Sequence, residues 1–323
     1  MNIAIVGLGD HVINKVLPAI LANDYNCVGI VSSSTTEKTI QFLNKYIPIF
    51  KDINHLKDLD LIIDCVYIST PISTHFVIAG QSLELGYNVI CEKPLCTNYK
   101  ETSQLFNIAH NKGLFLFEVN MHMHHYQFKL LDSLYKRSKK SNYFGKIQKI
   151  ILSFCIPHLS DDNFRYDPQL GGGAIYDVGF YPISSMLALE KNLEEKFIYL
   201  QSHKSVHGII NKSGNAFFMD ANSVLFELRW CMGQTYENYC QIIYEDGDIY
   251  FDRFFSKPNN LDSLTSFSAH NKVFKRKFKE NHFEIMLKDF KNILLSEKQN
   301  DLQNYKKLQE RTLLTARFFD KYF

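Results

Sequence analysis

The stretch Asn88-Val89-Ile90-Cys91-Glu92-Lys93-Pro94 is an apolar run that ends in two charged residues and a proline. The apolar residues predict a buried strand, and the proline ends it, so Lys93 should lie where the strand stops. In open α/β sheets, ligands bind outside the carboxyl ends of the strands. The sequence therefore predicts a lysine at a ligand-binding edge of a sheet.

The first 120 residues around this stretch alternate between strand and helix. Strands are predicted over residues 2–6, 27–31, 61–69, 87–91 and 114–119, with helical periodicity over residues 12–22, 39–46, 74–85 and 99–111. The connections are short, and Pro71 ends the third of these strands. This order predicts an α/β fold with a parallel, doubly wound sheet, that is, a Rossmann domain over residues 1–120.

A glycine turn follows the first predicted strand. Gly7 and Gly9 would let a pyrophosphate approach the amino terminus of a helix, whose free amides favour anions. The usual third glycine is replaced by Val12, so an ordinary strand-to-helix turn is the alternative interpretation. We predict that a dinucleotide contacts the residues of this turn, Gly7, Gly9, Asp10, His11 and Val12.

The end of the second predicted strand indicates which dinucleotide is preferred. Folds that prefer NAD place an acidic residue there to hold the ribose hydroxyls. Here the strand runs into Ser32 and Ser33, and no acidic residue precedes Glu37. Hydroxyls and the nearby Lys38 tolerate a 2′-phosphate, which a carboxylate would repel. The sequence favours NADP(H) over NAD(H), with Ser32 and Ser33 at the ribose, although no arginine is present to decide the choice.

After Asn120 the pattern changes to longer strands. Strands are predicted over residues 147–156, 197–207, 221–230, 241–244, 248–251 and 272–278, and helices over residues 173–189 and 282–296. Glu245-Asp246-Gly247-Asp248 predicts a hairpin turn. We therefore expect an α+β domain with an open, mostly antiparallel sheet over residues 121–301. A last helix, near residues 302–323, is expected to pack back on the first domain.

A second motif lies in this half, Gly171-Gly172-Gly173-Ala174-Ile175-Tyr176-Asp177-Val178-Gly179-Phe180-Tyr181-Pro182. Asp177 and Tyr181 are four residues apart, so on a helix they share one face. Taken singly, a lysine at a strand end is usually solvated, and a buried tyrosine usually packs with its hydroxyl satisfied. The joint occurrence of Lys93, Asp177 and Tyr181 indicates an enzyme.

The histidines between the two predicted domains could suggest a metal, since alternation places His122 and His124 on one strand face. No cysteine or carboxylate follows at ligand spacing, so no metal site is predicted. Hydroxyl or phosphate groups of a ligand are the expected partners here, because arginine offers phosphate a bidentate fork. An ordinary polar surface is the alternative. The predicted substrate-binding residues are His124, His125, Arg165, Tyr166 and Asp177.

Length and composition restrict the classes of protein to which this chain can belong. A chain of 323 residues is too long for one compact core, which favours two domains. A net charge of +2 gives no reason to expect nucleic acid or an anionic membrane as a partner. No apolar stretch reaches the roughly 18 residues of a membrane span. The chain enters a strand at once, without room for a signal peptide, and its seven cysteines show no CxxC spacing. We expect a cytoplasmic protein with reduced thiols.

Together these motifs resemble the glucose–fructose oxidoreductase/inositol dehydrogenase (Gfo/Idh/MocA) family. The matching segments are Gly7-x-Gly9, Ser69-Thr70-Pro71-x-x-x-His75, Glu92-Lys93-Pro94 and the glycine-rich motif that ends at Pro182, in the expected order over essentially the whole chain. The resemblance implies a cis Lys93–Pro94 bond. It also implies further cofactor contacts from Thr70, Pro71, His75, Glu92 and Lys93. The departures are Val12, the serine-rich strand end and a basic stretch before Phe144.

Within the family, the segments 118–127, 154–157 and 163–167 look most like nucleotide-sugar 3-ketoreductases. That resemblance implies NAD(P)-dependent reduction of a nucleotide-linked keto-sugar by a homodimer or homotetramer joined through its second sheet. Lys93 would stabilise the carbonyl oxygen, Tyr181 would donate the proton, and Asp177 would orient the substrate or the lysine. Oxidation of a free sugar, inositol or trans-diol is an alternative reaction. A regulator that senses the cofactor without turnover is an alternative of another class.

Overall fold

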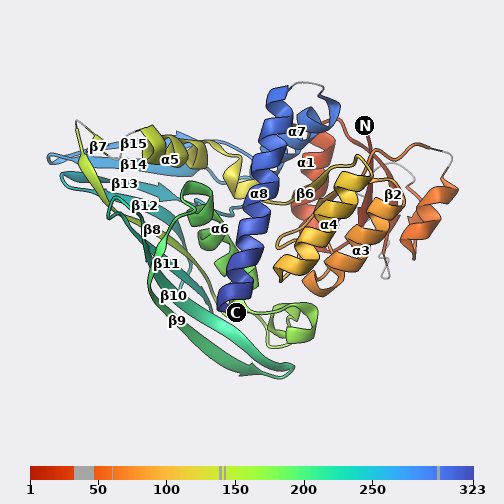
Figure 1. The fold of residues 1–323 in the computed structure, drawn as a ribbon, viewed down its shortest axis with the longest axis horizontal. Helices are drawn as coiled ribbons and strands as arrows, with labels where there is room; N and C mark the ends of the chain where they lie inside the picture. Colours follow the sequence, from red (N-terminus) through yellow and green to blue (C-terminus); the bar gives the residue numbers. More distant parts are fainter. Residues whose placement is uncertain (33–46, 60, 138–139, 142, 297–298) are drawn as a thin grey trace. The chain divides into compact units, whose positions relative to one another are not determined.

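The computed structural model describes residues 1–32, 47–59, 61–137, 140–141, 143–296 and 299–323 (Figure 1). The chain forms two compact units. Unit 1 comprises Met1–Val119 and Phe283–Phe323, and unit 2 comprises Asn120–His282. The chain therefore leaves unit 1 once and returns to it. The sequence analysis placed residues 283–301 in the second domain, and the structure corrects this boundary.

Unit 1 is built on a parallel sheet in the order β3-β2-β1-β4-β5-β6. Its strands are β1 (Asn2–Val6), β2 (Asn26–Val31), β3 (Ile49–Phe50), β4 (Cys65–Ile68), β5 (Asn88–Cys91) and β6 (Leu116–Glu118). β4 is wholly buried and β1 nearly so, as expected for strands covered on both faces. The strand order reverses between β1 and β4, which is the switch point where doubly wound sheets bind ligands. The predicted Rossmann topology is confirmed.

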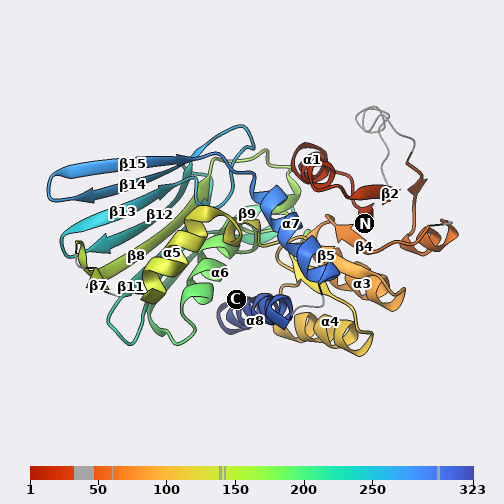
Figure 2. The ribbon, with the colours of Figure 1, turned by 90° about the horizontal axis from the view of Figure 1, so that it is seen from above.

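Helices cover this sheet, and Figure 2 shows α3, α4 and α8 side by side. The helical segments are η1 (Val12–Val16), α1 (Leu17–Ala22), η2 (Ile53–Asp58), α3 (Ile72–Glu84), α4 (Tyr99–Asn111), α7 (His282–Leu295) and α8 (Gln299–Tyr322). α7 belongs to unit 1 because it bonds to the start of the chain. The Tyr25 hydroxyl donates to Leu287 O at 2.9 Å, and Phe290 stacks on Phe117 with ring centroids 4.4 Å apart.

Unit 2 contains a sheet in the order β15-β14-β13-β12-β8-β11-β10-β9, with β7 paired to β8. Its strands are β7 (Lys140–Ser141), β8 (Gly145–Ile156), β9 (Glu194–Ser205), β10 (Gly208–Met219), β11 (Leu225–Met232), β12 (Glu237–Tyr244), β13 (Gly247–Asp252), β14 (Ser263–Ala269) and β15 (Lys272–Phe278). β8 and β11 pair in parallel, whereas their other neighbours are antiparallel. The predicted mostly antiparallel sheet is confirmed.

The helices α5 (Tyr126–Arg137) and α6 (Phe180–Leu189) lie on the same face of this sheet (Figures 1 and 2). Burial alternates along β11 and β12, so one sheet face is apolar and packed. The short segments η3 (Met121–Met123), η4 (Phe164–Tyr166), η5 (Pro168–Leu170) and η6 (Ile175–Gly179) complete the unit. η6 leads directly into α6 and carries part of the second sequence motif.

Local sequence patterns misplaced some elements. β10 and β14 were not predicted, because Gly208, Gly214 and several serines interrupt their apolar alternation. β4 is shorter than the predicted strand over residues 61–69, since Leu61 and Ile62 are 56% and 80% exposed. The helix predicted over residues 39–46 lies outside the described residues. All seven cysteines are buried, and none of them forms a disulfide in the described residues. None of the described helices combines the length and apolar character needed to cross a membrane.

Candidate active site

The glycine turn after β1 is shaped by its contact with the end of β4. Gly7 has φ +90°, and a Cβ there would lie 2.4 Å from Ser69 O, so only glycine fits. At Gly9 nothing lies within 4 Å of where a Cβ would be. Asp10 and His11 are exposed, whereas Val12 is fully buried and can offer a ligand only its backbone amide. The turn is therefore anchored at Gly7 and open at Gly9.

Two loops at the carboxyl edge of the sheet are joined by His75. Its Nδ1 lies 2.9 Å from Pro94 O, and its Nε2 lies 2.9 Å from Thr70 O. The ring is buried, and burial lowers the pKa of His75, although the two carbonyls favour the charged form. Both nitrogens contact the protein, so His75 holds the loops that carry Pro71 and Lys93. This placement differs from its predicted role as a cofactor contact.

Lys93 is half-buried at the end of β5, and the Lys93–Pro94 peptide is cis, as the resemblance implies. The next residue fixes the loop: Leu95 N–H donates to Glu118 Oε1 at 2.8 Å. The Thr312 hydroxyl donates to Glu118 Oε2 at 3.0 Å, which connects this loop to α8. Glu118 is a positioning residue that sequence reasoning left without a role.

Glu92 is a carboxylate of this edge that is held by several contacts. Its Oε1 lies 2.9 Å from His11 Nε2 and accepts a hydrogen bond from the Tyr67 hydroxyl at 2.7 Å. Burial raises the pKa of Glu92, but the charge and hydrogen bond of His11, the hydroxyl of Tyr67 and the charge of Lys93 together lower it below its usual value. Glu92 is therefore a carboxylate anion beside the glycine turn.

The predicted ribose contacts lie at the end of β2. Ser32 is buried, and its N–H donates to Phe50 O at 2.9 Å. Ser33 lies in 33–46, outside the described residues. The structure thus fixes the backbone at Ser32.

In unit 2, the glycine-rich loop holds η4 and η5 against η6. A Cβ on Gly172 would lie 2.6 Å from both Arg165 O and Asp167 O. The N–H of Gly172 donates to Asp167 O and that of Gly173 to Arg165 O, each at 2.8 Å. Because glycine permits this close approach, Arg165 is brought to Asp177, twelve residues further along the chain.

Arg165 and Asp177 form an ion pair, with Nε 2.8 Å from Oδ2. The guanidinium lies over the Phe164 ring at 4.6 Å. Both charged groups are partly exposed. An arginine and a carboxylate held together at a partly exposed site can recognise hydroxyl and phosphate groups.

Tyr181 lies one turn beyond Asp177, in an aromatic pocket. Its ring centroid is 5.0 Å from His122, 5.1 Å from Phe154 and 5.9 Å from Phe255. The side chain is 7% exposed. The phenol therefore sits in an apolar setting that limits its contact with water.

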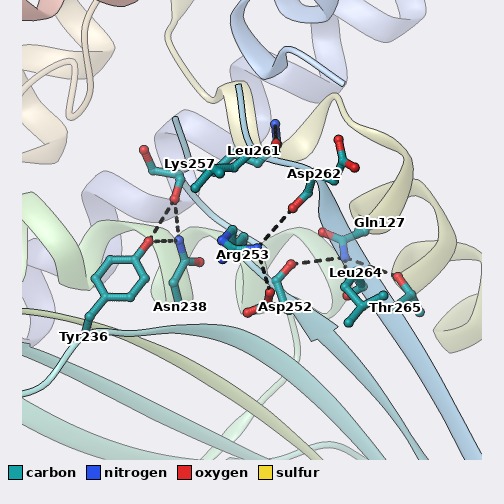
Figure 3. A network of polar contacts seen from close by, with 11 residues as sticks. Gln127, Tyr236, Asn238, Asp252, Arg253, Lys257, Leu261, Asp262, Leu264 and Thr265 are labelled. Carbon is teal, nitrogen blue, oxygen red and sulfur yellow. Dashed lines mark hydrogen bonds and ion pairs between the residues drawn. The ribbon is translucent and has the colours of Figure 1, made fainter. Parts of the chain in front are cut away.

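Phe255 comes from the loop between β13 and β14, residues 253–262, whose polar network is drawn in Figure 3. Arg253 Nη1 donates to Asp262 O at 3.2 Å, and Lys257 Nζ donates to Leu261 O at 2.7 Å. The Asn238 amide donates to Ser256 O, and Asn238 Oδ1 accepts from Phe255 N–H at 2.8 Å. These bonds hold the loop at both ends. Phe255 is thereby held against the ring of Tyr181.

Trp230 supports the turn that carries Asp177 and Tyr181. A Cβ on Gly179 would lie 3.0 Å from Trp230 Cγ, and one on Gly214 would lie 2.2 Å from Trp230 Cζ2. The indole is fully buried, and its Nε1 donates to Asn211 Oδ1 at 3.1 Å. The two glycines thus admit a large rigid ring directly beneath η6.

Both parts of the chain match models of one protein family. Residues 1–120 match an oxidoreductase family with an NAD-binding Rossmann fold, and residues 135–250 match the GFO/IDH/MocA C-terminal domain. The chain belongs to the Gfo/Idh/MocA family of oxidoreductases. The resemblance inferred from the motifs is confirmed.

Named relatives in the Gfo/Idh/MocA family act on sugars. The dTDP-3,4-didehydro-2,6-dideoxy-alpha-D-glucose 3-reductase of Actinomadura kijaniata is 27% identical over 261 residues, 80% of this chain and 76% of the relative. D-xylose 1-dehydrogenase (NADP(+)) 2 of Haloferax volcanii is 28% identical over 189 residues, 57% of this chain and 56% of the relative. A crystal structure of a 3-ketoreductase from Actinomadura kijaniata in complex with NADP and TDP-benzene has a TM-score of 0.86 at 24% identity, covering 99% of this chain and 96% of that chain. At this identity, the superposition establishes the shared fold.

The turn at the edge of unit 1 fits the dinucleotide of a Gfo/Idh/MocA enzyme. The open space at Gly9 admits an anion to the backbone amides at the start of the helix. Gly7, Gly9, Asp10, His11, Thr70, Pro71 and Glu92 all lie at or beside this edge, together with Lys93. No cluster of three metal-ligating side chains occurs in the described part of the chain.

Two of the predicted substrate residues form hydrogen bonds within the protein. The His125 ring is buried, its Nε2 lies 2.7 Å from Phe254 O, and its Nδ1 accepts from Phe128 N–H at 3.4 Å. The Tyr166 ring is also buried, and its hydroxyl accepts from Leu159 N–H at 3.0 Å. His124 is buried as well. Arg165 and Asp177 are the partly exposed polar pair among the predicted substrate residues.

His125 stacks on His282 with ring centroids 4.0 Å apart. Burial lowers the pKa of His125 to about 3, and burial lowers that of His282 well below its usual value. Above pH ~6.5 both histidines are neutral in the folded and unfolded chain, so stability is retained. As pH falls from there toward 3, the unfolded chain gains the protons. We expect His125 alone to lower the free energy of unfolding by about 2 kcal/mol at pH 5.

Urea denaturation followed by Trp230 fluorescence at neutral pH and at pH 5 measures this loss. His282→Phe keeps a stacked ring and removes one titrating group, so its stability should depend less on pH. Equal pH dependence in both proteins would contradict the assignment of acid sensitivity to this histidine pair.

Proposed function

We propose that this oxidoreductase reduces the keto group of a nucleotide-linked 3-keto sugar and prefers NADPH. The proposal rests on one observation. Asp177, which is paired with Arg165, lies one turn before Tyr181 in a chain that also has Lys93. The 3-reductases among the relatives support the substrate class, and the NADP in the related ketoreductase structure supports the cofactor.

The residues of this chain supply what ketone reduction needs besides hydride, which the bound dinucleotide provides. The Lys93 ammonium donates a hydrogen bond to the carbonyl oxygen and stabilises its developing negative charge. The Tyr181 hydroxyl delivers the proton to that oxygen. Asp177, held by Arg165, accepts a hydrogen bond from the sugar and orients it.

Arg165 also provides a reason for a nucleotide-linked substrate. Its Nε is engaged by Asp177, and no acceptor among the described residues takes its Nη groups. A guanidinium whose two Nη groups are open suits phosphate oxygens. A diphosphate-linked sugar offers such oxygens, whereas a free sugar does not.

Purified protein should oxidise NADPH when a TDP-linked 3-keto sugar is added, measured by the loss of reduced-nicotinamide absorbance. NADPH should bind at least as tightly as NADH in a fluorescence titration. Two other results would each favour a different function. Turnover with NADP+ and D-xylose or an inositol would favour a dehydrogenase function, which the xylose dehydrogenase relative supports. Tight cofactor binding without turnover of any carbohydrate would favour a regulator.

We further propose that the enzyme forms a homodimer or homotetramer through its large sheet and acts in the cytoplasm. Phe197 and Tyr199 on β9, with Val273 and Phe274 on β15, expose apolar surface that a second copy would bury. Seven cysteines without a disulfide suit a reducing compartment.

A further inference from the structure

Phe164 is an exposed aromatic ring that the fold of unit 2 holds in place. It belongs to the short turn η4, in which Tyr166 is buried while 45% of Phe164 remains exposed. Tyr166 anchors the turn, because its carbonyl accepts a hydrogen bond from the Ser205 hydroxyl at 2.6 Å and its own hydroxyl accepts from Leu159 N–H at 3.0 Å. The exposed ring therefore sits on a fixed piece of backbone.

Arg165 lies against this ring and is itself held in position. Its guanidinium carbon is 4.6 Å from the centroid of the Phe164 ring, and its Nε lies 2.8 Å from Asp177 Oδ2. Its backbone N–H donates to Asn163 Oδ1 at 3.1 Å. Since its Nη groups meet no acceptor among the described residues, the side chain is fixed but keeps donors for a ligand.

The three side chains stand in the order of the parts of a nucleotide-linked sugar. Such a molecule runs from the sugar through two phosphates to a nucleoside. Asp177 is proposed to hold the sugar and Arg165 a phosphate, and Phe164 is the next group in this row. A phenyl ring has no hydrogen-bonding group, but its face suits any nucleobase, because every base has a flat π surface.

We propose that Phe164 stacks on the base of the nucleotide-linked substrate, and that Phe164 and Arg165 together form its nucleoside diphosphate site. This inference rests on the proposed function, because it requires a substrate that carries a nucleotide. It adds the residue that recognises the part of the substrate most distant from the reacting carbonyl. Stacking tolerates different bases, so this site selects a nucleotide-linked sugar over a free sugar rather than one base over another.

Equilibrium binding of thymidine diphosphate (TDP) to the full-length protein, measured by isothermal titration calorimetry, tests the proposal without any turnover. Phe164→Ala should weaken TDP binding about tenfold or more, the usual effect of removing the aromatic partner of a stacked base. Phe164→Tyr keeps a ring of similar size and should bind TDP like wild type. Inorganic pyrophosphate has no base, so Phe164→Ala should bind it as tightly as wild type does. Phe274→Ala is the matched control and should bind TDP normally, since Phe274 is an exposed phenyl ring on β15, at one edge of the sheet.

The other outcomes separate this inference from the proposed reaction. Unchanged TDP affinity in Phe164→Ala would overturn the inference, even if the wild type reduces TDP-linked keto sugars. An equal loss of TDP and pyrophosphate binding would also overturn it, since the ring would then act only by placing Arg165. A wild-type protein that does not bind TDP would overturn it as well. TDP binding that depends on Phe164, in a protein that reduces no keto-sugar, would support the inference and contradict the proposed reaction.

Discussion

Replacement of Lys93 by alanine should lower kcat by about 10²–10³-fold or more, with little change in NADPH affinity. The ammonium is the group proposed to stabilise the carbonyl oxygen as it gains charge. The dinucleotide is proposed to contact mainly backbone groups of the glycine turn and of Thr70–Pro71, which this change leaves in place. The cis Lys93–Pro94 loop is also anchored elsewhere, through His75 and Glu118.

Steady-state turnover and an NADPH titration on the same preparation measure both effects. Lys93→Arg is the control, since it keeps a charge but changes the shape and reach of the donor. Like Lys93→Ala, it should bind NADPH normally, and it should recover turnover only in part. Near-normal turnover in Lys93→Ala would exclude the lysine from the mechanism.

Tyr181→Phe should lower kcat by about 10²–10⁴-fold, the usual contribution of a general acid. The substitution keeps the ring that packs against His122, Phe154 and Phe255, so the melting temperature and NADPH affinity should barely change. A purely packed tyrosine would give the opposite result, a stability change of roughly 1 kcal/mol with an unaltered rate.

Tyr166→Phe provides the matched control for this experiment. Its hydroxyl is bonded to Leu159 N–H, and its ring is buried like that of Tyr181. This variant should lose stability and keep its turnover. A Tyr181→Phe enzyme that behaves like Tyr166→Phe would leave Lys93 as the one side chain acting on the carbonyl, with solvent as the proton source.

The parallel sheet and the glycine turn could be predicted because their signals are local. An apolar strand that ends in Gly7 or in Pro94 indicates its own boundary. The strands β10 and β14 carried no such signal, since Gly214 is present to admit Trp230 from a neighbouring strand. A glycine that serves a tertiary contact interrupts the very pattern by which a strand is recognised.

The histidines of the candidate site show the same limit of prediction from local sequence. His75 and His125 were expected to meet ligands, but both are buried with their ring nitrogens on backbone groups. Burial depends on elements far away in the chain, and a local motif does not encode it. The loop at residues 253–262 was missed for the same reason, because Phe255 reaches Tyr181 only through the folding of the sheet.

Trp230 has a practical consequence, since it is the sole tryptophan of the chain. An indole packed between Gly179 and Gly214 should emit at short wavelength, because it is buried away from water. Its emission wavelength therefore reports on the packing of the segment that bears Asp177 and Tyr181. The variants of unit 2, Tyr181→Phe, Tyr166→Phe and His282→Phe, can be screened by this emission, without any label, before a rate is measured.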